Sequence, residues 1–306
     1  VASSFPSPLG GKRPSTSSRK RPWPDINTIE MTRAPVHLAK ISPPVPSGSF
    51  PRKRLFRMLD RARRKPAVWI SGPPGSGKTT LVSSYLSARG STCLWYRLDE
   101  ADQDSASFFF YLGMAAQRAT PRKRKPLPLL SPENLSALSI FAQRYFEELY
   151  SRLGSGSVLV FDDYQKVPED SGIHEVVRTG LSRLPEGINT ILISRSDPHP
   201  LFARKRAHEL LEVIGWNDMR LTLDETKGIA RHRGKRKPSE EEIRHLKRRS
   251  DGGAAGLILL LEDGEKNAMG SRGPRGHVPE EMFDYFGTEI FERLDDEARA
   301  FLLKSA

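Results

Sequence analysis

Five short apolar segments recur along the chain, separated by stretches with helical patterning. The segments cover residues 67–70, 92–98, 157–163, 190–194 and 210–214. Their apolar runs are continuous, which is typical of strands buried on both faces. Stretches such as 51–65 and 135–153 instead carry apolar residues at helical spacing. This alternation predicts an α/β fold, in which helices cover both faces of a parallel five-stranded sheet.

After the fifth segment the pattern becomes helical. Segments 222–231 and 239–249 each begin with a Ser/Thr-x-x-Glu capping pattern, and segment 252–262 is apolar. Three short helices in succession predict a small helical lid domain at 219–264. The sheet domain is then expected at 35–218.

The first apolar strand runs directly into GPPGSGKTT, a phosphate-binding loop of the form G-x-x-x-x-G-K-[ST] between a strand and a helix. Its glycines let backbone N–H groups curl around a phosphate, and the following helix adds a positive dipole end. Lys78 is expected to reach the β and γ phosphates, and Thr79 to offer its hydroxyl to Mg²⁺. The candidate nucleotide-binding residues of this stretch are Gly72, Pro73, Pro74, Gly75, Ser76, Gly77, Lys78, Thr79 and Thr80.

The third and fourth strands add charged residues at their carboxyl ends. SVLVFDD ends in Asp162 and Asp163, as a Walker B strand does. An apolar run ending in Asp is common, but the phosphate-binding loop upstream favours Asp162 as a Mg²⁺ ligand and Asp163 as the acid that activates water. The fourth strand ends at Arg195, which could contact the γ-phosphate. The alternative for Arg195 is a salt-bridged surface arginine.

Composition and charge indicate which binding partners the chain can be expected to have. The chain has 306 residues and a formal net charge of +12. Residues 1–70 hold the whole excess, with 15 lysines and arginines against three acidic residues. The excess therefore belongs to the leading arm and the first helix, while the nucleotide-binding body that follows is balanced, and direct DNA binding by that body is not indicated. Residues 1–34, rich in Ser, Pro, Arg and Lys, predict a disordered basic arm.

Two absences in the sequence bear on location. No apolar run approaches the roughly 18 residues that span a membrane. Cys93 is the only cysteine, which excludes disulfides within the chain and thiolate zinc sites. We therefore expect a cytoplasmic protein with no membrane partner.

Further motifs surround these residues, and together they resemble the MalT-like branch of the STAND ATPases, which are LuxR-type bacterial transcriptional regulators. The motifs are KISPPVPSGSFPRKRL, LWYRLDEADQD, VLVFDDY, ILISRSDP and the lid segment SDGGAAGL. The resemblance runs from about residue 40 to residue 306. It implies a P-loop NTPase sheet of the ASCE/AAA+ type, the helical lid, and a loop with the beginning of a winged helix at 265–306. A superhelical sensor and a C-terminal helix-turn-helix would follow outside this chain.

The resemblance also implies a mechanism. Members rest with ADP and self-associate when ATP and a small-molecule or protein inducer bind, and slow hydrolysis resets them. The inducer would act through the missing C-terminal domains, and DNA would bind only through the helix-turn-helix. Carried over, Lys78 and Thr79 handle phosphate and Mg²⁺, while Asp162 holds the metal. Asp163 activates the attacking water, and Arg195 contacts the γ-phosphate.

Two positions in the resemblance need separate mention. Arg52, before the sheet, matches a family arginine near the nucleotide. The lid usually carries Trp-Pro where this chain has Gly253-Ala254. A proline that stacks near the base is thus missing, which affects lid contact and nucleotide retention.

Two other classes of protein use the same loop. A free-standing ATPase or kinase would need a substrate pocket and brisk turnover, and no added substrate motif is visible. A nucleic-acid-dependent ATPase is suggested by the basic arm. Hydrolysis rates measured with and without DNA separate these classes from a switch.

Overall fold

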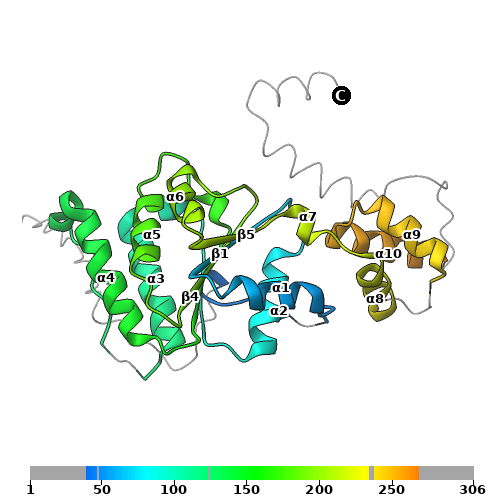
Figure 1. The fold of residues 1–306 in the computed structure, drawn as a ribbon, viewed down its shortest axis with the longest axis horizontal. Helices are drawn as coiled ribbons and strands as arrows, with labels where there is room; N and C mark the ends of the chain where they lie inside the picture. The colour runs from blue at the N-terminus through cyan, green and yellow to red at the C-terminus, as the bar shows by residue number, and fades with distance from the viewer. Residues whose placement is uncertain (1–38, 47, 123–124, 234–237, 269–306) are drawn as a thin grey trace, which may run out of the picture. The chain divides into compact units, whose positions relative to one another are not determined.

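The computed structural model describes residues 39–46, 48–122, 125–233 and 238–268. Five strands form one sheet in the order β2-β3-β4-β1-β5, and all neighbouring pairs are parallel (Figure 1). The strands are β1 (Ala67–Ser71), β2 (Cys93–Arg97), β3 (Val158–Asp162), β4 (Asn189–Ser194) and β5 (Leu211–Ile214). The predicted α/β fold with a parallel five-stranded sheet is confirmed.

Both faces of the sheet are buried. Successive side chains of a strand point to opposite faces, and here both sets pack against helices. In β1, Trp69 belongs to one apolar cluster, whereas Val68 and Ile70 belong to another. Helices α1 and α2 cover the second face, and α3, α4 and α5 cover the first (Figure 1). Their bounds are α1 (Lys53–Ala62), α2 (Lys78–Arg89), α3 (Ser105–Ala119), α4 (Leu138–Arg152) and α5 (Ile173–Ser182). This two-sided burial explains why the strands are continuously apolar in sequence.

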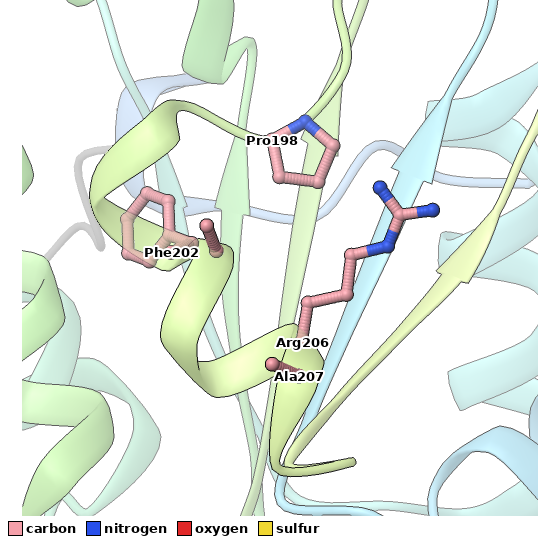
Figure 2. A pocket seen from close by; sticks show the side chains of 5 residues that line it. Pro198, Phe202, Arg206 and Ala207 are labelled. Carbon is pink, nitrogen blue, oxygen red and sulfur yellow. The ribbon is translucent and has the colours of Figure 1, made fainter.

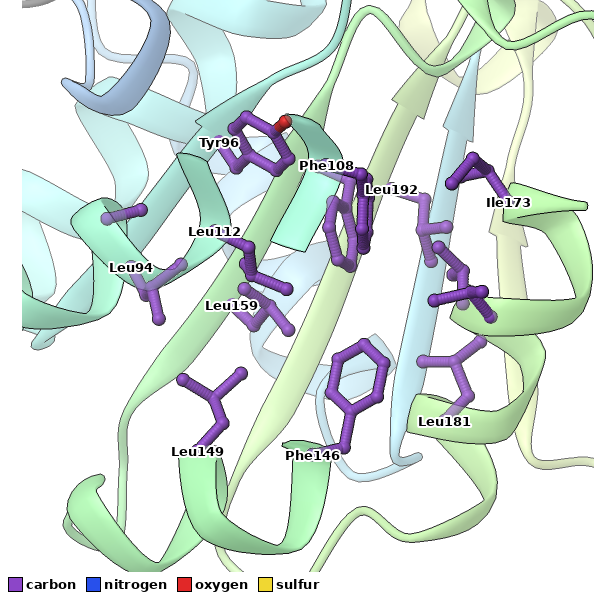
Figure 3. Packing of buried hydrophobic residues seen from close by; sticks show 14 of the residues in the cluster. Leu94, Tyr96, Phe108, Leu112, Phe146, Leu149, Leu159, Ile173, Leu181 and Leu192 are labelled. Atoms are coloured by element: carbon purple, nitrogen blue, oxygen red, sulfur yellow. The ribbon is translucent and has the colours of Figure 1, made fainter. Parts of the chain in front are cut away.

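The larger cluster fixes the half of the sheet formed by β2, β3 and β4 (Figure 3). Aromatic rings dominate it: Phe108 of α3 stacks on Phe161 of β3 with a centroid distance of 6.1 Å. Tyr96 of β2 packs at a tilted angle against Phe108, 5.5 Å away. Such pairs add to the apolar area that is buried. The cluster therefore holds rigidly the strands whose carboxyl ends carry the candidate acids.

Short elements connect the larger ones. They are η2 (Ala39–Ile41), η3 (Glu100–Gln103), η4 (Pro132–Ala137), η5 (Tyr164–Lys166), η6 (Pro200–Phe202), α6 (Ala203–Ala207) and α7 (Trp216–Met219). The acidic loop after β2 has a structural role in starting helices. Asp99 accepts a hydrogen bond from the Ala101 N–H of η3, and Asp104 accepts from the Ser107 N–H of α3. Asp104 is thus the N-cap of α3, which begins at Ser105.

The lid comprises α8 (Leu223–Arg233), α9 (Glu240–Arg249) and α10 (Ala254–Ala268). Both sequence-predicted capping pairs form: Glu225 N–H donates to the Thr222 hydroxyl at 3.2 Å, and Glu242 N–H donates to the Ser239 hydroxyl at 3.2 Å. Leu221, Ile229 and Leu257 form its small core. The predicted arm at 1–34 lies outside the described residues, as does the part of the predicted loop and winged-helix segment after residue 268.

Candidate nucleotide-binding site

The phosphate-binding loop, residues 72–79, connects the carboxyl end of β1 to α2. Gly75 and Gly77 have positive φ angles of 68° and 85°. An L-residue with a side chain rarely adopts these angles, so both glycines are required for the curl of the loop. Gly77 is the N-cap of α2, and the helix therefore points its free N–H groups at the concave side of the loop.

Lys78 lies in this loop and is largely buried, with 8% of its surface exposed. Its Nζ donates hydrogen bonds to the carbonyl oxygens of Gly72 at 2.6 Å and Pro73 at 2.9 Å, and to the Ser76 hydroxyl at 3.2 Å. The ammonium group is thus held against the same backbone whose N–H groups are available for an anion. The predicted contact of Lys78 with the β and γ phosphates stays a prediction.

Thr79 and Asp162 come together, although 83 positions separate them. The Thr79 hydroxyl donates to Oδ1 of Asp162 at 2.9 Å. The sheet order explains the contact, because β3 is separated from β1 only by β4, and the carboxyl ends of parallel strands share one edge. A hydroxyl and a carboxylate at hydrogen-bond distance can both reach one cation.

The environment of Asp162 is consistent with a cation. Its side chain is buried, and burial together with the nearby charge of Asp163 raises the pKa of Asp162 to about 6. A divalent ion would stabilise the ionised form. No group of three or more His, Cys, Asp or Glu residues gathers as a metal site in the described ranges. A site with one carboxylate and one hydroxyl is suited to Mg²⁺, which keeps several waters and takes oxygens from substrate phosphates.

The raised pKa of Asp162 predicts a pH-dependent stability in the metal-free protein. Between about pH 4 and pH 6 the folded carboxyl keeps a proton that the unfolded chain has lost. The free energy of unfolding should therefore fall as pH rises through this range, by on the order of 3 kcal/mol from this group. Denaturant unfolding in EDTA, comparing the wild type with Asp162→Asn, checks this. The variant should lack that part of the pH dependence, and identical pH profiles would contradict it.

Asp163 directly follows β3 and is in the left-handed region with φ of 56°. Its Oδ2 accepts from Nε of Arg97 at 2.6 Å, and its Oδ1 accepts from Nε2 of Gln165 at 2.9 Å. Asp163 is partly exposed, unlike the buried Asp162. The carboxylate is thus held in place at the rim of the site by an arginine and an amide.

Arg195 immediately follows β4. Its backbone N–H donates to Oε1 of Gln165 at 3.0 Å, so Gln165 connects the ends of β3 and β4. The side chain of Arg195 is partly buried. Its place at the carboxyl edge of the sheet agrees with the position expected from sequence, and its contact with a γ-phosphate stays a prediction.

Arg52 faces the lid. Its Nη2 donates to Oε2 of Glu225 at 3.0 Å and to the Met219 carbonyl at 2.6 Å. The side chains of Arg52 and Glu225 are both buried. Arg54 donates to the same Glu225 oxygen at 3.2 Å. Arg52 also lines a cavity beside the phosphate-binding loop. Its predicted role at the nucleotide stays open, and its main observed contact joins α1 to α8.

The cavity of about 360 Å³ adjoins the phosphate-binding loop. The loop and α2 contribute Gly75, Gly77, Thr80, Leu81 and Ser84, and the segment before α1 contributes Val45, Pro46, Gly48, Ser49, Phe50 and Arg52. The lid closes it with Ile229, His232, Arg233, Ala254, Ala255 and Ile258. The walls are mainly apolar, and Arg52 and Arg233 add charged groups. Such a lining suits a flat ring that is attached to a charged tail.

The lid segment Gly253-Ala254 lies directly against the phosphate-binding loop. The Ala255 N–H donates to the Gly75 carbonyl at 2.9 Å. A Cβ built on Gly77 would be 3.4 Å from the Cβ of Ala254. The position at which this chain departs from the family pattern thus forms a close contact between the lid and the loop.

A second hollow, of about 330 Å³, lies beside α6 and is lined by Pro198, Phe202, Ala203, Arg206 and Ala207 (Figure 2). Phe202 is fully buried beneath it, and Arg206 extends along its rim (Figure 2). None of its lining residues was predicted as a site residue. The cavity at the phosphate-binding loop remains the candidate site.

Sequence reasoning missed three side chains at the site. Arg97 and Gln165 hold Asp163, and Glu225 holds Arg52. Arg97 belongs to the LWYRLDE motif, which was the available signal. Its role depends on the pairing of β2 with β3, where Arg97 is in register with Asp162.

Comparison with known proteins agrees with this geometry. A family model described as an AAA ATPase domain matches residues 51–201, which include the loop, both aspartates and Arg195. The chain is 30% identical over 275 residues to the HTH-type transcriptional regulator MalT of Yersinia pestis (strain Pestoides F). That match covers 87% of this chain and 30% of the regulator. The chain therefore spans about a third of the length of the curated relatives it matches.

Two solved structures share the fold. A STAND protein with a tetratricopeptide repeat sensor from Pyrococcus horikoshii matches with a TM-score of 0.54 and 18% identity, over 86% of this chain and 35% of that one. A Walker-type ATPase of Pyrococcus abyssi matches with a TM-score of 0.55 and 16% identity, over 82% of this chain and 76% of that one. The fold and the loop thus define a P-loop NTPase domain of the AAA ATPase class. Within that class, the resemblance to MalT-like STAND ATPases is confirmed.

Proposed function

We propose that this chain is the ATP-binding part of a MalT-like transcriptional regulator and acts as a slow switch, resting with ADP and active with ATP. One observation carries the proposal: Lys78, Thr79 and Asp162 converge on one concave loop beside a cavity. Loop N–H groups and Lys78 would hold the β and γ phosphates, and Thr79 and Asp162 would hold Mg²⁺. The mainly apolar cavity would take the nucleoside.

The roles of the remaining site residues follow from their positions. Mg²⁺, when bound, neutralises charge that develops on the phosphates. Asp163 would orient and deprotonate a water, because it is partly exposed at the edge where the γ-phosphate would end. Arg195, after the neighbouring strand, would contact that phosphate. The Arg97 and Gln165 contacts limit how far Asp163 can move.

The partners follow from the relatives. The ATP form would self-associate in the cytoplasm, and an inducer and DNA would bind through domains other than this one. The matched relatives are HTH-type transcriptional regulators, which supports a role in gene control. Among the described residues, no helix combines the length and apolar character needed to cross a bilayer.

Hydrolysis rate tests the switch against the two other classes. We expect wild-type chain with Mg²⁺ to turn over ATP more slowly than about one per second, the low end for ordinary enzymes. Addition of duplex DNA should leave the rate unchanged, since residues 71–306 carry equal numbers of basic and acidic side chains. Faster sustained turnover would favour a free-standing ATPase. Clear stimulation by DNA would favour a nucleic-acid-dependent enzyme.

A further inference from the structure

Two sequence motifs that the proposed function leaves unused meet in the structure. Lys40 comes from the KISPPVP stretch, and Asp99 and Asp102 come from LWYRLDEADQD. Lys40 Nζ contacts Oδ2 of Asp99 at 2.6 Å and Oδ2 of Asp102 at 3.0 Å. The ammonium also lies 4.6 Å from the ring centroid of Tyr111. These residues and Tyr96 are called the Lys40 clamp.

The clamp is a well-paired charge cluster in which Asp102 is buried, Lys40 is largely buried and Asp99 is about half exposed. The side chain of Asp102 has no exposed surface, and that of Lys40 is 15% exposed. Oδ1 of Asp102 accepts from the Tyr96 hydroxyl, and Oδ2 also accepts from the Asp99 N–H at 2.8 Å. Tyr96 is itself fixed in the core of the sheet against Phe108 (Figure 3). An ion pair of this kind is costly to break, because one charge would stay buried without its partner.

The clamp anchors the start of the segment that lines the candidate nucleotide cavity. We call residues 41–46 and 48–50 the wall segment. Val45, Pro46 and Phe50 from it line the cavity, and Val45 is only five positions after Lys40. Prolines at 43, 44 and 46 restrict the backbone between them. This short, restricted backbone has few ways to absorb a displacement at Lys40 before the cavity is reached.

The rest of the wall segment leads to the lid. The Ser83 hydroxyl of α2 donates to the Pro44 carbonyl. Phe50 packs against the lid core, and a Cβ built on Gly228 of α8 would be 2.3 Å from its ring. The segment thus lies between the sheet domain and the lid, and the Lys40 clamp is one of its anchors on the sheet domain, beside the Ser83 bond and the buried Ile41.

We propose that Lys40 is a positioning residue for nucleotide binding: its ion pairs with Asp99 and Asp102 hold the wall segment where the nucleoside packs. This inference rests on the proposed function. Among the described residues, the partners of Lys40 are Asp99, Asp102, Tyr96 and Tyr111. All four lie outside the phosphate-binding loop, so Lys40 acts on the nucleoside end of the ligand. Loss of the clamp leaves the wall segment to be ordered when nucleotide binds, which lowers affinity.

The test compares ligands with and without a nucleoside. Equilibrium titrations of the full chain would use ATP, ADP and inorganic tripolyphosphate with Mg²⁺. Lys40→Met and Asp102→Asn should each lower the affinity for ATP and for ADP by about tenfold, because the preorganised wall segment is lost. Tripolyphosphate affinity should stay at the wild-type value. Asp102→Asn keeps the shape of the side chain, and tripolyphosphate binding shows that the loop is folded.

Lys166→Met is the matched control, because Lys166 pairs at 3.2 Å with Glu100 of the same acidic segment but does not belong to the wall segment. It should bind all three ligands as the wild type does. Unchanged ATP affinity in both clamp variants would overturn the inference, as would an equal loss for ATP and tripolyphosphate. A wild-type chain that binds none of the ligands would instead overturn the proposed function, and the inference with it.

Discussion

Lys78→Ala should abolish ATP binding at micromolar nucleotide. The buried Nζ is held by the Gly72 and Pro73 carbonyls, and it supplies the cationic side chain of the loop. Hydrogen bonds to charged groups contribute about 1.5–3 kcal/mol each. Losing the two bonds that Lys78 would donate to the β and γ phosphates therefore weakens ATP binding by roughly a hundredfold or more. Equilibrium titration with a fluorescent ATP analogue measures the loss.

The control for this variant is Lys65→Ala, which removes a lysine that pairs with Glu212 at the β5 edge. It should bind ATP as the wild type does. Circular dichroism would verify that α2 still forms after Lys78 is removed. Unchanged ATP affinity in a folded Lys78→Ala protein would rule out the loop as the phosphate site.

Asp163→Asn should slow ATP hydrolysis by about a hundredfold to ten-thousandfold, the usual contribution of a positioned general base. ATP affinity should stay near the wild-type value, because Asp162 and Thr79 keep their contact. Asparagine tolerates the left-handed backbone at this position, so the loop after β3 should not change. Single-turnover hydrolysis and ATP titration on the same preparation separate the two effects.

Asp170→Asn serves as the matched control, since Asp170 is an exposed acid further along the loop after β3. It should hydrolyse ATP at the wild-type rate. If Asp163→Asn also hydrolyses ATP normally, the water-activating role of Asp163 is wrong. If it loses ATP binding as well, Asp163 instead supports the bound ligand.

The sequence predicted the features that depend on local pattern. Continuous apolar runs gave the five strands, and the glycine spacing gave the phosphate-binding loop, because each depends on neighbouring residues. The capping pairs at Thr222 and Ser239 gave the starts of two lid helices. Thr79 and Asp162 were both predicted at one Mg²⁺ site, and their hydrogen bond brings them together because both follow parallel strands that share an edge; the metal role itself stays a prediction.

Contacts between distant segments could not be predicted in the same way. Arg97 reaches Asp163 because β2 pairs with β3 across two intervening helices, and the sequence alone does not give the strand order. The pairing of Lys40 with Asp102 and that of Arg52 with Glu225 have the same cause. In each case both residues lay in noted stretches, but only the folded chain shows which partner each one has.

The carboxylate of Glu225 also limits how the lid can move. Its Oε2 accepts from Arg52, from Arg54 and from the Thr222 N–H that precedes α8, while its Oε1 has no hydrogen-bond partner within the described part of the chain. A rotation of α8 away from α1 would therefore break the contacts of two guanidinium groups with a single oxygen at the same time. Because these contacts are lost together, we expect the lid to have two discrete positions rather than a continuous range of them.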